Sequence, residues 1–116
     1  MPSAKLYLTI TNDFLHDMAT GTWAACLLVL FVLSARLPGM PDAAAVAIHA
    51  AMWSVFWLLA AALIILTATG AARLMYWRSH SSPEELVAKR RALIAKHVAF
   101  LVIYGAGTAW AWILVS

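Results

Sequence analysis

Three long stretches without a charged residue constrain the fold of this chain more than any other feature. They run over residues 18–35, 43–72 and 98–116. Each is about as long as the roughly 20 residues that cross a bilayer as an α-helix. Charged residues make up only 11% of the chain, against about 25% in ordinary soluble domains. The sequence therefore predicts an all-α integral membrane protein with three transmembrane helices.

Most of the basic residues lie between the second and third apolar stretches. They are Arg73, Arg78, Lys89, Arg90, Arg91 and Lys96. Because loops rich in lysine and arginine stay on the cytoplasmic side, this loop is expected to face the cytoplasm. The N-terminus then lies inside and the C-terminus outside, in a bacterial inner membrane. The net charge of +3 is thus explained by membrane orientation, and no nucleic-acid partner is expected.

The whole chain, residues 1–116, is expected to form one membrane domain. The predicted spans cover about residues 13–36, 44–72 and 95–115, with a cytoplasmic basic loop over 73–94. Two prolines and a glycine within residues 37–42 predict the turn between the first two helices.

The helix ends are predicted from capping residues. Residues 1–11 are expected to form a short lead at the membrane interface, with Asn12 or Asp13 capping the first helix. The third helix is expected to begin in water near Pro83, since proline in the first turn followed by acidic residues is typical of a helix start.

Two histidines are predicted to lie at the same membrane depth. At a rise of 1.5 Å per residue, His16 and His97 are each about 28–30 Å from the outer ends of their helices, near the cytoplasmic boundary. A histidine within a membrane span is costly without a partner, which makes it a candidate functional residue. Two at one level on different helices are what a pair of axial haem ligands requires.

Three interpretations of this pair stay open. The two histidines are interfacial residues bonded to their neighbours, axial ligands of a b-type haem, or parts of a copper site or proton relay. For copper, Met18 would supply a soft ligand near His16. A ligating histidine needs an acceptor for its second ring nitrogen, and Asp13, Asp17 and Thr20 lie within one turn of His16.

Other residues are expected to contact the cofactor. Gly21 would let a flat macrocycle approach the first helix, although glycines in spans also serve close helix packing. Arg73, Arg91 and Lys96 would pair with haem propionates on the cytoplasmic side.

His49 lies near the outer boundary and is a second, weaker candidate metal ligand. Met40 and Met52 are close in sequence, which suggests an outer metal site or a second haem completed by another subunit. Alternatively, His49, Trp53 and Trp57 share one helical face and would bind a quinone there.

Short motifs around these residues resemble the membrane family of copper resistance protein D-like domains and the bacterial membrane-bound protoporphyrinogen oxidase. His16 precedes Trp23 by seven positions, as in the family's His-x6-Trp-x-Gly-Gly. Residues 69–73 read Thr-Gly-Ala-Ala-Arg, like its Thr-Gly-x-x-Arg, and Lys96 and His97 are like its lysine-containing helix start. The resemblance implies a helical bundle that handles haem b or copper through His16 and Lys96 or His97.

The chain departs from this family in two respects. Ala24, Ala25 and Cys26 stand where the family has paired glycines, and three spans are fewer than its usual four or more. A cofactor site is therefore expected to be completed by other membrane subunits or by further copies of the chain.

The leading hypothesis is a small cytochrome b-like subunit that exchanges electrons with a quinol. The alternatives are a structural subunit that packs against larger membrane partners, and a copper-handling membrane protein. No nucleophile–base pair, phosphate loop or closed metal motif is present, so the chain is not expected to be an enzyme on its own.

Overall fold

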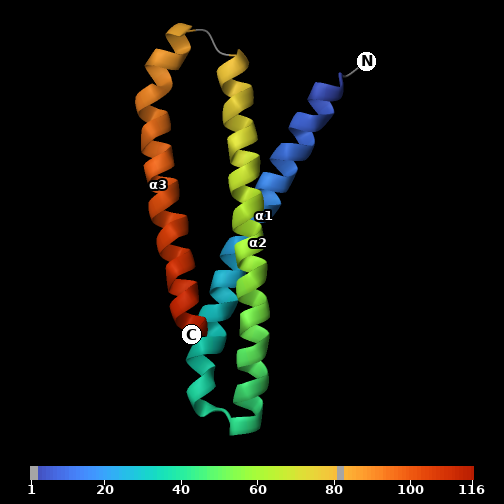
Figure 1. Ribbon diagram of the computed structural model, residues 1–116, viewed down its shortest axis with the longest axis vertical. Coiled ribbons are helices and arrows are strands. Elements are labelled where there is room, and N and C mark those ends of the chain that lie inside the picture. Colours follow the sequence, from blue (N-terminus) through green and yellow to red (C-terminus); the bar gives the residue numbers. More distant parts are fainter. Residues whose placement is uncertain (1–2, 81–82) are drawn as a thin grey trace.

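A computed structural model describes residues 3–80 and 83–116, with side chains over 3–75, 83–84 and 90–116. The described part consists of α1 (Ala4–Arg36), a short 3-10 helix η1 (Leu37–Gly39), α2 (Asp42–His80) and α3 (Pro83–Val115) (Figure 1). All three α-helices are long and apolar enough to cross a membrane. The predicted all-helical architecture is confirmed at this level.

The expected start of the first helix is wrong. Helix α1 begins at Ala4, and the Ser3 hydroxyl accepts a hydrogen bond from the Leu6 amide at 3.3 Å as its cap. Residues 4–20 contain neither glycine nor proline, so nothing stops the helix from extending toward the N-terminus. Asn12 and Asp13 therefore lie inside the helix, where their side chains are free to bind another helix.

The turn between α1 and α2 is where the prolines predicted it. Pro38 stands in the first turn of η1, and the Met40 amide closes it by donating to the Leu37 carbonyl at 3.0 Å. Residues 73–94, the predicted cytoplasmic segment, are largely helical. Helix α2 continues to His80, and α3 begins at Pro83, as expected.

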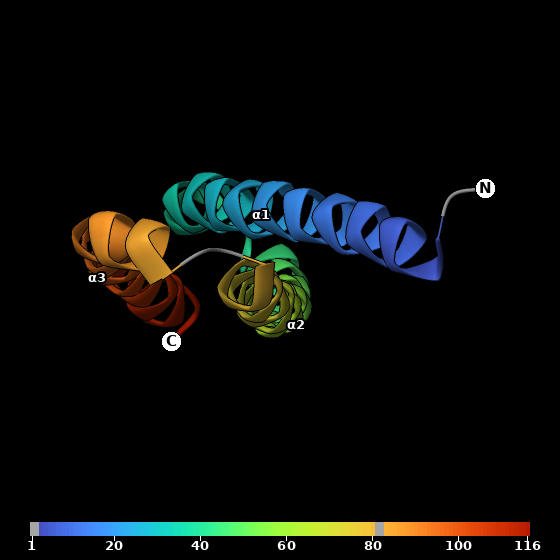
Figure 2. The same cartoon turned by 90° about the horizontal axis from the view of Figure 1, so that it is seen from above.

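The three helices pack most closely near the η1 end. Helix α1 crosses α2 obliquely (Figures 1 and 2). The C-terminal half of α3 packs against the C-terminal half of α1 and the N-terminal half of α2. Helices α1 and α3 run in the same direction, opposite to α2. The core includes Cys26, which is a free cysteine. The buried residues of this core are Trp23, Cys26, Leu30, Met52, Phe56, Leu59, Ala62, Ala111 and Val115.

From this core the N-terminal halves of α1 and α3 diverge. In both views α1 leans away to one side of α2 while α3 stays on the other (Figures 1 and 2). Helix α3 is the least covered of the three: 11% of its most apolar window is buried, against 22% in α1 and 28% in α2. Its contacts with the other helices are therefore confined mainly to its C-terminal half.

Candidate functional site

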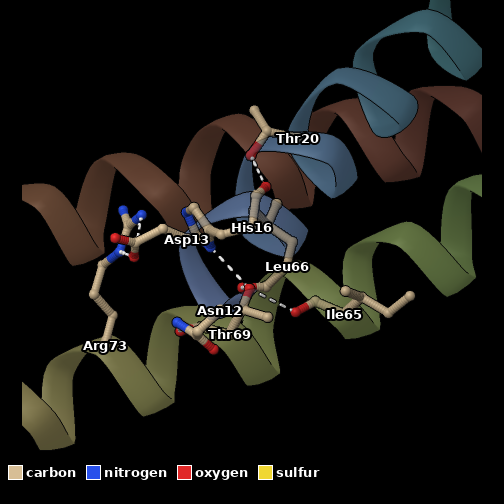
Figure 3. A network of polar contacts seen from close by, with 8 residues as sticks. All are labelled: Asn12, Asp13, His16, Thr20, Ile65, Leu66, Thr69 and Arg73. Atoms are coloured by element: carbon tan, nitrogen blue, oxygen red, sulfur yellow. Dashed lines mark hydrogen bonds and ion pairs between the residues drawn. The ribbon is translucent and has the colours of Figure 1, made fainter. Parts of the chain in front are cut away.

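A cluster of polar side chains joins α1 to α2 toward the open end of the bundle (Figure 3). The Asn12 amide donates to the Thr69 carbonyl at 3.0 Å, and the His16 Nδ1 atom lies 2.9 Å from the Thr69 hydroxyl. Arg73 forms an ion pair with Asp13, at 2.9 Å between Nη2 and Oδ1. Residues one turn apart on α1 thus meet residues one turn apart on α2.

The partner of the His16 ring is Thr69 on α2, not one of the three residues expected on α1. Thr20 uses its hydroxyl to donate to the His16 backbone carbonyl at 2.8 Å, as threonines in helices often do. Asp13 is paired with Arg73, and Asp17 is exposed. Sequence reasoning missed Thr69 as a partner because it considered only neighbours on the same helix.

His97 lies on the exposed surface of α3. Its Nδ1–H donates to the Leu93 carbonyl of the same helix at 2.6 Å. The less exposed residues of α3 nevertheless fall on one stripe along the helix, and His97 lies on that stripe. These residues are Leu93, Phe100, Tyr104, Gly107, Thr108, Ala111, Leu114 and Val115. His97 thus continues the inner face of α3 beyond the region where that face is covered.

An aromatic contact relates the register of α1 to that of α3. The rings of Trp23 and Tyr104 lie 4.5 Å apart between centroids, and the Trp23 indole donates to the Thr108 hydroxyl at 3.2 Å. His16 precedes Trp23 by seven residues, and His97 precedes Tyr104 by seven. Seven residues make about two helical turns, so each histidine shares the face of its aromatic residue about 10.5 Å along the helix.

The two histidines thus have equal offsets from the contact between α1 and α3, but the structure does not bring them into contact. His16 is bound to α2 through Thr69, and the helices that carry His16 and His97 diverge at this level (Figure 1). Among the described residues, no group of three or more histidine, cysteine or acidic side chains is placed to hold a metal ion. Shared ligation by His16 and His97 stays a prediction.

The residues expected around a macrocycle are distributed over different faces. Gly21 is exposed and lies about 140° around the helix from His16, so it is on another face. Arg73 already binds a carboxylate, that of Asp13, and Lys96 and Arg91 are exposed on α3. Gly107 accommodates Trp23, because a Cβ atom there would lie 2.5 Å from the indole ring.

His49 takes part in contacts at the other end of the bundle. Its Nε2–H donates to the Val115 carbonyl of α3, and its ring stands edge-on to Trp53 at 6.4 Å. The Met52 side chain is fully buried in the core, and Trp57 is exposed. The contacts of His49 thus join α2 to α3, and its expected roles in metal or quinone binding stay predictions.

Comparison of this chain with known protein families, with curated proteins and with solved structures found no match.

Proposed function

We propose that the chain is a haem b-binding subunit of a membrane electron-transfer complex, with His16 and His97 as axial ligands. The observation that carries this proposal is the equal offset of the two histidines from the Trp23–Tyr104 contact. Each histidine lies seven residues before the aromatic residue of its own helix. Two histidines at equal distances from one contact between two helices that run in the same direction match what a pair of axial haem ligands requires.

On the side of the histidines α1 and α3 do not pack directly against each other, since α1 leans to one side of α2 and α3 stays on the other (Figures 1 and 2). A haem bound by both histidines would link the two helices there. Arg73 and Lys96 are the proposed partners of the propionates. When bound, the haem iron would exchange single electrons between a quinol and a partner subunit.

A second candidate, the structural subunit, is favoured by the sparse cover on α3. Its exposed apolar residues include Leu101, Val102 and Ile103, each more than half exposed. In a bilayer, such a face contacts lipid or the helix of another subunit. The two candidates are compatible if a larger membrane partner packs against α3 and encloses the cofactor.

The proposal is tested by a reduced-minus-oxidised absorption spectrum of the full chain, purified in detergent from cells with ample haem. A b-type α-band at about one haem per chain is expected, and metal analysis should find iron without stoichiometric copper. A colourless, metal-free protein that still co-purifies with larger membrane subunits would contradict haem binding and favour the structural role. Stoichiometric copper without haem would favour copper handling.

The proposed orientation places the N-terminus inside and the C-terminus outside a bacterial inner membrane, with the basic segment around Arg90 and Arg91 inside. A reporter that is active only outside the cytoplasm should therefore work when fused after Ser116 and fail when fused before Met1. Replacing Arg90, Arg91 and Lys96 together by glutamine should weaken this preference. Equal activity of both wild-type fusions would contradict the orientation.

A further inference from the structure

Thr69 is the one polar residue in the buried class among the residues whose side chains are described. Its hydroxyl has three neighbours: the Ile65 carbonyl at 2.8 Å, the Leu66 carbonyl at 3.1 Å and the His16 Nδ1 atom at 2.9 Å. Its own carbonyl accepts the Asn12 amide from α1. Thr69 is thus bound to α1 through both its backbone carbonyl and its hydroxyl.

These contacts determine where the His16 proton lies. A threonine hydroxyl has one proton, and both carbonyl neighbours can only accept. With the hydroxyl proton directed to Ile65, as is usual for threonine in a helix, the hydroxyl oxygen is left to accept. His16 must then donate from Nδ1, and its neutral ring carries no proton on Nε2. The alternative would leave the close contact between the Thr69 and Ile65 oxygens without a proton.

We infer that Thr69 is a positioning residue, which holds the His16 proton on Nδ1 and so leaves Nε2 unprotonated and able to bind a metal. The two ring nitrogens are separated by Cε1 and point in different directions, so Nε2 points away from Thr69 (Figure 3). This inference rests on the proposed function for the identity of the ligand, haem iron. The proton position itself follows from the contacts of this chain alone.

An acceptor on the second nitrogen of a ligating histidine fixes the tautomer and raises the basicity of the ligand. Free histidine prefers its proton on Nε2, which would block ligation there. A hydroxyl on a second helix that reverses this preference therefore prepares the ring before any ligand arrives. The Asn12 bond to the Thr69 carbonyl ties α1 and α2 together at the same point and keeps the geometry fixed.

The test compares Thr69→Val, which removes the hydroxyl at nearly constant volume, with Thr69→Ser, which restores it. Thr67→Val is the matched control, because the exposed Thr67 hydroxyl donates only to the Leu63 carbonyl of its own helix. Nitrogen NMR of the haem-free full chain, labelled on histidine and assigned with His16→Ala, reports the tautomer. Circular dichroism checks that each variant keeps its helical content.

In the wild type, Thr69→Ser and Thr67→Val, the His16 signal should be that of a neutral ring protonated on Nδ1. In Thr69→Val it should shift toward the Nε2-protonated form. On the haem-loaded chain, Thr69→Val should weaken haem binding by about 10- to 100-fold and make the reduction potential more positive. Thr69→Ser and Thr67→Val should leave the haem affinity and the reduction potential near the wild-type values.

The two proposals fail in different ways. A wild-type ring protonated on Nε2, or a Thr69→Val tautomer equal to that of the wild type, would overturn the inference even if haem binds normally. A wild-type chain without haem would contradict the proposed function, while an Nδ1-protonated ring that depends on Thr69 would still support the positioning role.

Discussion

Replacing either His16 or His97 by alanine is expected to abolish the haem spectrum of the purified chain. Each change removes one of the two nitrogens proposed to bind the iron. Loss of a supporting group alone typically costs 10- to 100-fold in metal affinity, so loss of a ligand should cost more than about 100-fold. The measurement is the haem content per chain, from the absorbance of the reduced and oxidised protein.

Two further variants make this result specific. Val98→Ala removes an exposed side chain next to His97 and should keep the full haem content. His49→Ala tests whether the cofactor lies instead at the opposite end of the bundle. There the His49 ring is bound to the Val115 carbonyl. If His49→Ala lost the haem while His16→Ala and His97→Ala retained it, the cofactor would lie at the opposite end and the proposed ligand pair would be wrong.

Gly107→Ala is expected to destabilise the bundle strongly. The added Cβ atom would lie 2.5 Å and 2.6 Å from two carbons of the Trp23 ring, far closer than real contacts allow. The indole has little freedom to move, because it is buried and bound to Thr108. Overpacking of this kind costs about 1–3 kcal/mol or more, so thermal unfolding in detergent should shift to lower temperature.

The chain contains a matched control for this substitution. Gly105 lies two residues away on the same helix, and an added Cβ atom would meet nothing within 4 Å. Gly105→Ala should therefore change the unfolding free energy by less than about 1 kcal/mol, with alanine favoured in a helix. Combining Gly107→Ala with Trp23→Leu should recover part of the loss. Equal effects at Gly105 and Gly107 would show that Trp23 does not pack against Gly107.

The number of helices long and apolar enough to cross a membrane was predictable, because it depends only on the length of charge-free runs. The start of α1 was not, because capping residues such as Asn12 and Asp13 also occur inside helices. Only the packing of α2 against α1 supplies the Thr69 carbonyl and the Arg73 guanidinium that these two side chains bind. Local signals do not contain the position of a second helix.

The common depth of His16 and His97 stays a prediction, and their lateral arrangement could not be predicted. Counting residues places the two histidines at one level, and they have equal offsets from the contact between Trp23 and Tyr104. The angle between α1 and α3 depends on how side chains interdigitate at their crossing, which periodicity does not determine. For the same reason the orienting role of Thr69 was missed, although it stands out as a polar residue in an apolar span.

The Trp23–Tyr104 contact has a mechanical consequence for the histidines. Both histidines lie about 10.5 Å from this contact along their helices, so a tilt of either helix about the contact displaces its histidine by a similar distance. A change of about 6° in the tilt of α3 at this point moves His97 by about 1 Å relative to His16. The spacing of the two imidazoles therefore depends in part on the fit of the Trp23 indole ring against Gly107, two turns away.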